Sequence, residues 1–265
     1  MNIYKHELRL YFKSTVIWIV SLVAIVLFFV SIFPSFKDSA EAMNQILDAF
    51  PDGLKNALGL SAMDLSSVIG FFGFMFSYIT LVAGVQAMNL GLSVLSNEQR
   101  DKTADFLLAK PVRRIEIVHA KLLAALTYIV LTNLVFFIVT FVSIMAISDG
   151  SVSSLVLILF LGSLFLTQLF FLGLGMLMSV FMDKLKTVIP VSLGVVFGFF
   201  IINLLNESID GKPLKFLTPF AYFNTSYIYE HIAFETPWLI LNCTLAITFT
   251  IGAYLKYIKK DVPSV

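Results

Sequence analysis

The chain has 265 residues, of which 58% are hydrophobic and only 13% are charged, and phenylalanine alone occurs 27 times. An ordinary soluble domain carries about 25% charged residues, so this chain could not cover a water-exposed surface with polar groups. The net charge of +1 says little by itself, and a single cysteine, Cys243, excludes an internal disulfide or a cysteine-based metal cluster. The composition therefore predicts an all-α membrane protein, because a helix satisfies its own backbone polar groups within lipid.

Residues 2–14 alternate basic and apolar residues at helical spacing. Apolar and aromatic residues share one helical face (Tyr4, Leu8, Tyr11 and Phe12), and basic residues occupy the other (Lys5, Arg9 and Lys13). This pattern predicts an amphipathic N-terminal helix that lies flat at an anionic membrane interface. The alternative is a simple cytoplasmic extension of the first span. The apolar run that follows is longer than the core of a secretory signal and lacks a cleavage site, so we expect a retained anchor.

Six apolar stretches are long enough to cross a bilayer, which requires roughly 20 helical residues. They cover residues 16–36, 68–95, 122–147, 152–182, 187–206 and 238–257, and their interiors contain no Asp, Glu, Lys, Arg or His. The pattern predicts six transmembrane helices in one domain, residues 1–265.

The charged residues are divided unevenly between the alternate connections of these spans. The N-terminus, residues 96–121, residues 183–186 and the C-terminal tail with Lys256 hold 14 of the 18 Lys and Arg residues and 7 of the 17 acidic ones. The opposite connections hold 4 basic and 10 acidic residues. The positive-inside rule therefore places both termini in the cytoplasm, as an even number of spans requires.

Small residues recur at four-residue spacing in two spans. Ala83, Ala87 and Gly91 do so in the second span, and Gly194 and Gly198 do so in the fifth. Such spacing lets helix backbones approach closely, so it predicts helix packing, with the second and fifth spans lining the contact between two chains.

The polar residues within the spans are uncharged. Most are expected to form hydrogen bonds between helices, and a minority could line a substrate path, for which we select Gln86, Asn89 and Asn203. A coupled carrier would need an ionisable group inside a span, and none is present. The sequence has no GxxxxGK[ST] and no HExxH motif, and its three histidines fall in separate loops, so we expect no catalytic residue and no metal site.

The connection between the second and third spans, residues 96–121, is the most informative. Ser96 and Gln99 fit a capping box, which predicts that a short helix begins there. Phe106, Leu107 and Leu108 give that helix an apolar patch, and Pro111 ends it. A second helix is expected to begin near Arg113 and to continue into the third span. The patch could dock on a partner protein or rest on lipid headgroups.

The order of residues in this connection resembles that of the type-2 ABC transporter permeases. The shared features are an acidic start at Glu98, the leucine pair, a proline, Arg113 or Arg114, and Lys121 at the foot of the third span. This chain has Lys102-Thr103 where the family often has Gly-Thr. The resemblance extends to the six spans and to Leu217-Thr-Pro-Phe-Ala-Tyr222, so it covers essentially the whole chain.

The resemblance implies that residues 96–121 form a coupling helix that seats in a separate ATPase subunit. The residues expected to dock are Glu98, Arg100, Thr103, Phe106, Leu107, Leu108, Pro111, Arg113, Arg114 and Lys121. It also implies short re-entrant helices within residues 207–237, where the alternative is aromatic anchoring at the outer headgroups. ATP and magnesium would be bound by the partner ATPase and no cofactor by this chain.

These expectations describe the transmembrane subunit of a bacterial ABC exporter in the cytoplasmic membrane. It would pair with a second permease chain, contact lipid but no nucleic acid, and export hydrophobic or amphipathic cargo such as a peptide, a bacteriocin or a drug. The alternatives are a non-transporting scaffold or sensor subunit, a membrane enzyme, and a stand-alone channel or carrier.

Overall fold

A computed structural model of the chain describes residues 3–39, 51, 65–100, 113–148, 150, 152–182, 187–209 and 213–259, and this part contains no strand. Within it, six helices are long and apolar enough to cross a membrane. They are α1 (Ile3–Asp38), α4 (Val68–Arg100), α6 (Arg114–Ser148), α7 (Ser154–Phe181), α8 (Ile189–Ser208) and α10 (Thr236–Lys259). The prediction of an all-α protein with six spans is thus confirmed.

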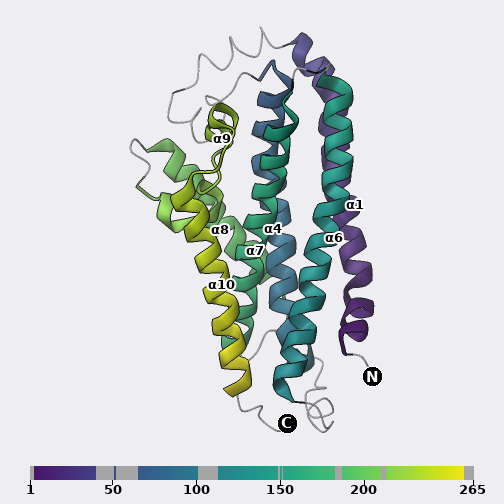
Figure 1. The fold of residues 1–265 in the computed structure, drawn as a ribbon, viewed down its shortest axis with the longest axis vertical. Coiled ribbons are helices and arrows are strands. Elements are labelled where there is room, and N and C mark those ends of the chain that lie inside the picture. Colours follow the sequence, from purple (N-terminus) through teal and green to yellow (C-terminus); the bar gives the residue numbers. More distant parts are fainter. Residues whose placement is uncertain are drawn as a thin grey trace.

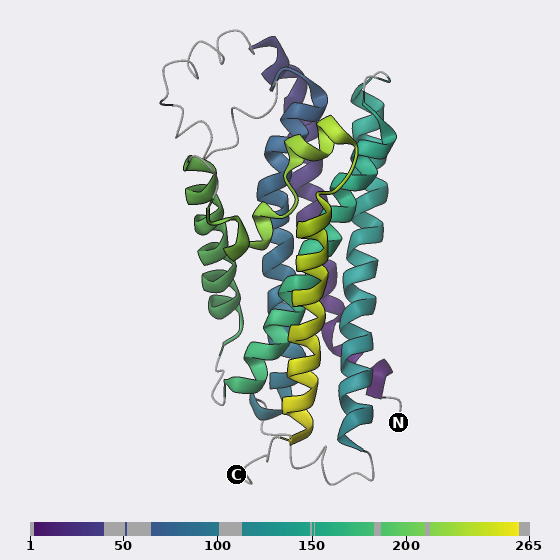
Figure 2. The ribbon, with the colours of Figure 1, turned by 60° about the vertical axis from the view of Figure 1, so that its left-hand side comes forward.

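The six helices form one elongated bundle (Figure 1). The start of α1 and the end of α10 lie at the same end of it, called the terminal end below. Helices α4 and α7 are the most buried, with α1 and α6 on one side of them and α8 and α10 on the other (Figures 1 and 2). Which side of the membrane the terminal end faces stays a prediction from the charge bias.

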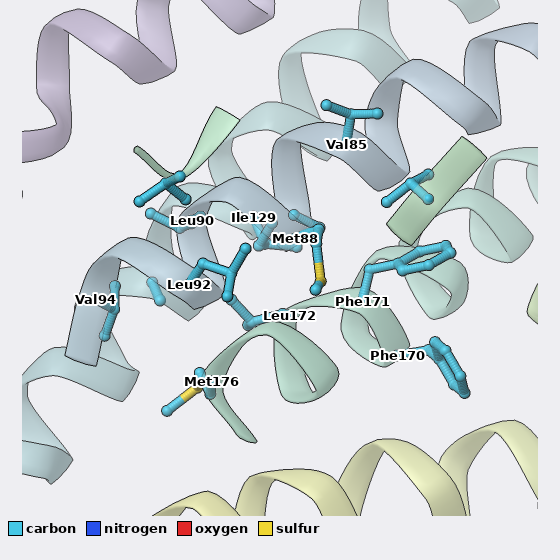
Figure 3. Packing of buried hydrophobic residues seen from close by; sticks show 14 of the residues in the cluster. Val85, Met88, Leu90, Leu92, Val94, Ile129, Phe170, Phe171, Leu172 and Met176 are labelled. Atoms are coloured by element: carbon cyan, nitrogen blue, oxygen red, sulfur yellow. The ribbon is translucent and has the colours of Figure 1, made fainter. Parts of the chain in front are cut away.

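Among the described helices, the most extensive contact joins α4 and α7. Leu92 and Met88 of α4 meet Leu172 and Met176 of α7, and all four side chains are fully or almost fully buried (Figure 3). A Cβ atom added to Gly91 would overlap the carbonyl oxygen of Leu172. Only glycine allows the two backbones to approach this closely, so the four-residue spacing correctly predicted a packing surface.

The partner of that surface differs from the prediction. Ala83 and Ala87 are fully buried within the single chain, and Gly91 faces α7. Ala83, Ala87 and Gly91 therefore pack within the chain, and a part for them in the contact between two chains is not supported. Gly194 and Gly198 behave differently, because a Cβ atom added to either one meets nothing within 4 Å. Their face of α8 packs on no other described helix, so a role in pairing with a second chain stays a prediction.

The glycine contact predicts unequal effects for the same substitution. We expect Gly91→Ala to lower the free energy of unfolding by about 1–3 kcal/mol, because the new methyl group forces α4 and α7 apart. Gly162→Ala in α7 is the matched control, because a Cβ atom added there meets only Phe234 at 3.7 Å, and the better helix propensity of alanine should leave stability unchanged or slightly higher. Thermal unfolding of both variants in detergent micelles measures the difference. Equal midpoints for the two variants would show that the α4–α7 contact is not as close as described.

The N-terminal segment does not form a separate interfacial helix. Residues from Ile3 to Asp38 are one continuous α-helix, so the segment extends the first span, which was the alternative weighed above. Of the predicted apolar face, Tyr11 is buried against the protein, whereas Phe12 is 57% exposed. The prediction of a separate flat helix is not confirmed, because the segment continues α1 and part of its apolar face packs against the protein.

The segment between α8 and α10 turns back into the bundle. It contains η1 (Lys215–Leu217), η2 (Pro219–Ala221) and α9 (Thr225–His231). The hydroxyl of Thr218 donates to the carbonyl of Phe199, halfway along α8. Phe220 lies with its ring centroid 5.3 Å from that of Phe171 and 5.6 Å from that of Phe200. These contacts favour the re-entrant interpretation of this part over simple aromatic anchoring.

Candidate functional site

The predicted docking residues that the structure describes lie at the end of α4 and in the first turns of α6, at the terminal end. Glu98 and Arg100 lie in the last turn of α4, and Arg113 and Arg114 stand at the start of α6. The remaining members of the loop, namely Thr103, Phe106, Leu107, Leu108 and Pro111, lie outside the described residues. The second predicted helix is confirmed, because α6 runs without a break from Arg114 to Ser148.

The capping box at Ser96 was a wrong prediction. Ser96 lies inside α4, and its hydroxyl donates to the carbonyl of Leu92 one turn earlier. Ser96 and Asn97 are buried against neighbouring helices, so tertiary packing continues α4 beyond a local pattern that is typical of a helix start. The helix of the second span therefore continues without a break to Arg100.

Lys121 cannot contact a docked partner directly. Its side chain is fully buried, and its amine lies 3.1 Å from Oε1 of Glu7, whose side chain is 3% exposed. The same amine donates to the carbonyl of Val94 at 2.7 Å. Lys121 thus joins α6 to both α1 and α4, and its inclusion among the docking residues is corrected to a structural role.

The first turn of α6 is also connected to the end of α10. The guanidinium of Arg114 donates to the carbonyl of Ile258 at 3.4 Å. His119 stacks on Tyr254 and shares a hydrogen bond of 3.0 Å with its hydroxyl. Arg113, by contrast, is 84% exposed and pairs with Glu116 in its own helix, so it remains accessible to a partner.

The N-terminal part of α1 is fixed to the same region by tyrosine hydroxyls. Tyr128 of α6 donates to the carbonyl of Leu8, and the side chains of Asn97 and Tyr11 are hydrogen-bonded. Together with the Glu7–Lys121 pair, these contacts make the terminal ends of α1, α4 and α6 one connected unit. A force applied between α4 and α6 would therefore act on three helices together.

A cavity of about 550 Å³ lies in the same half of the bundle. It is bounded by α1, by α4 and by the first residues of α8. Its lining residues are Tyr11, Ser14, Thr15, Trp18, Gln86, Asn89, Leu90, Ser93, Asn97, Thr187, Val188, Ile189 and Pro190. More than half of these residues carry a hydroxyl or an amide, and the others are apolar or aromatic. None of the residues in this list carries a charge.

Two of the three residues selected for a substrate path meet in this cavity. Gln86 and Asn89 line it, whereas Asn203 lies farther along α8 and is absent from the lining. The sequence reasoning missed the contributions of α1 and of the α8 start. A signal existed in α4, where Asn89, Ser93 and Asn97 follow one another at four-residue spacing and so share one helical face.

Gln86 also belongs to a network of buried amides. Its Nε2 donates to the hydroxyl of Thr132 at 2.8 Å, and its Oε1 accepts from Gln168 at 3.3 Å. The Oε1 of Gln168 in turn accepts from Asn133 at 2.5 Å. The predicted interhelical hydrogen bonds are therefore confirmed here, and they connect the wall of the cavity to α6 and α7.

Comparison with known proteins places the chain in a family. The family model for the ABC-2 family transporter protein matches residues 1–229, which is most of the chain. No curated protein matches the sequence. ABC-2 permeases are membrane transport subunits that generally partner with ABC ATPase subunits. The chain, with its six apolar helices and its family match, is a multi-pass membrane protein of the ABC-2 transporter family and a transmembrane subunit of an ABC transporter.

Proposed function

We propose that the chain is the membrane-spanning subunit of an ATP-driven exporter of the bacterial cytoplasmic membrane. Separate ATPase chains bind the connection of residues 96–121 at the cytoplasmic face through its part up to residue 114, since Lys121 is buried, and this chain contributes no catalytic residue. The cargo is hydrophobic or amphipathic, such as a peptide, a bacteriocin or a drug, and it moves outward.

The observation that best supports the proposal is how the first turns of α6 are connected to the docking segment and to the neighbouring helices. This 35-residue helix starts directly after the docking segment and crosses the whole bundle. Lys121 fixes its first turns to α1 and α4, and Arg114 fixes them to α10. A displacement of the docking segment by an ATPase would therefore move α6 together with α1, α4 and α10, which are joined to it. No chemical step in this chain is needed.

We also propose that two permease chains pair through α8. Its exposed face carries Gly194 and Gly198 together with Leu193, Phe197 and Ile201, which are between 38% and 53% exposed. Such a surface allows close approach of a second helix. The second span contributes little to this pairing in our proposal, because its small residues are already covered by α7.

Flux measurements in liposomes test this function against its alternatives. The chain is reconstituted with its candidate ATPase, and movement of a fluorescent uncharged amphiphile and of a labelled apolar peptide is followed with ATP. We expect transport of at least one probe with active ATPase and none with a hydrolysis-inactive ATPase. Transport without any ATPase would favour a channel or carrier. A scaffold or sensor would be favoured if the ATPase binds the chain and hydrolyses ATP, while neither probe is transported and neither probe changes the rate of ATP hydrolysis.

A further inference from the structure

The lining of the cavity between α1, α4 and α8 contains polar groups that the protein itself does not use. In the part of the chain that the structure describes, the side chains of Trp18, Asn89, Ser93 and Thr187 form no hydrogen bond. All four residues line the cavity, and none of their polar atoms is among the fully enclosed unpaired atoms. Polar groups at membrane depth are costly unless they are hydrogen-bonded, so these four are available to a ligand or to water.

The volume and the chemistry of the walls narrow the class of ligand. A volume of about 550 Å³ is within the range of cavities that hold small molecules. Among the residues that the structure describes, none that lines the cavity is ionised at neutral pH, so a charged group would enter this part without a counter-charge and would be disfavoured. Hydroxyls and amides offer donors and acceptors to an uncharged partner, and the aromatic rings of Tyr11 and Trp18 offer flat apolar surfaces.

The exposed residues at the rim of the cavity indicate the side from which a ligand would enter. Ser14 of α1 and Thr187 and Pro190 at the start of α8 are exposed on the outside of the bundle, and Ile189 is 56% exposed. The opening therefore lies between α1 and α8, on the surface of the apolar bundle. A ligand with an apolar tail could keep that tail against α1 and the start of α8, beside the face of α8 proposed to pair with a second chain, while its head enters the cavity.

We propose that this cavity binds the uncharged, hydrogen-bonding headgroup of an amphiphile, that is, a head bearing hydroxyls or amides, and that Asn89 and Ser93 recognise it. The site is a cargo site only if the proposed transport function is correct, whereas binding itself does not depend on that function. The proposal narrows the cargo from hydrophobic or amphipathic molecules in general to amphiphiles whose head has no net charge.

Fluorescence of Trp18 reports on the site directly. The chain has two tryptophans, so Trp238→Phe leaves Trp18 as the sole tryptophan. This variant is placed in lipid nanodiscs without any ATPase. It is titrated with three probes that share a decyl chain, namely decyl glucoside, decyl phosphate and decyltrimethylammonium. We expect a saturable change for the glucoside and only a weak, linear change for the two charged probes.

Two further variants in the same background decide whether the cavity is responsible. Asn89→Leu with Ser93→Ala should weaken glucoside binding by about tenfold, because two hydrogen bonds are lost. Asn89→Asp keeps the shape of the side chain and adds a charge, so it should favour the cationic probe over the glucoside. Both variants must give the same monodisperse profile as the parent chain.

Equal responses to the three probes, or titrations that the Asn89 variants do not change, would overturn the proposed site. Failure of the transport proposal would be detected in different experiments, namely the ATPase co-purification and the flux measurement, which are made with the partner ATPase present. A chain that binds the glucoside selectively but binds no ATPase would keep the site and lose the exporter function. A chain that binds an ATPase but binds none of the probes selectively would keep the exporter function and lose the proposed site.

Discussion

Replacing Lys121 by methionine should lower the free energy of unfolding by about 3–5 kcal/mol, because it removes the lysine that pairs with the buried carboxylate of Glu7. The Lys121 and Glu7 side chains are 0% and 3% exposed, so water cannot compensate for the loss. The substitution also removes the hydrogen bond to the carbonyl of Val94. Thermal unfolding in detergent micelles, followed by size-exclusion profile and circular dichroism, measures the effect.

The double variant Glu7→Gln with Lys121→Met separates the charge effect from simple loss of packing. It removes both charges, so most of the stability lost in Lys121→Met should return. Arg113→Met is the matched control, since it breaks a pair with Glu116 in which Arg113 is 84% exposed. An exposed pair of this kind contributes less than about 1 kcal/mol. Similar losses for Lys121→Met and Arg113→Met would contradict the buried pair.

The membrane spans could be predicted from sequence because their signal is local and physical. A bilayer requires about 20 apolar residues in a row, and this requirement can be read without knowing any tertiary contact. Each of the six predicted stretches overlaps a described helix, with ends that differ mainly where a helix continues beyond the apolar stretch. The clearest extensions are at the start of α1 and the start of α6.

The role of Lys121 could not be predicted because its partner is distant in sequence. Glu7 lies 114 residues away, and both residues occur in segments rich in charges that would ordinarily face water. Ser96 shows the converse problem, in which a correct local pattern is overridden by burial of the helix that contains it. Local sequence patterns identify the elements but not the contacts that they make.

The candidate site was predictable only in part, for the same reason. The spacing of Ala83, Ala87 and Gly91 indicates a surface for close packing, but it does not say whether that surface meets α7 or a second chain. Gln86 and Asn89 were recognisable as polar groups in an apolar span. The contributions of Trp18 and Thr187 to the same cavity depend on how α1 and α8 are placed beside α4.

The central claim is that residues 96–114 bind an ATPase, and Leu107→Asp with Leu108→Asp tests it most directly. Two carboxylates in place of an apolar patch should cost several kcal/mol when that patch is buried by a partner, so the complex should dissociate. Leu107→Met with Leu108→Met is the matched control, because it keeps both the volume and the apolar character. Each variant is co-expressed with the candidate ATPase and purified through a tag on the permease.

In this co-purification we predict that the parent chain and the methionine variant retain the ATPase, while the aspartate variant loses it yet still inserts and purifies as a monodisperse membrane protein. Equal retention of the ATPase by the aspartate and methionine variants, or its absence from the parent chain, would contradict the account.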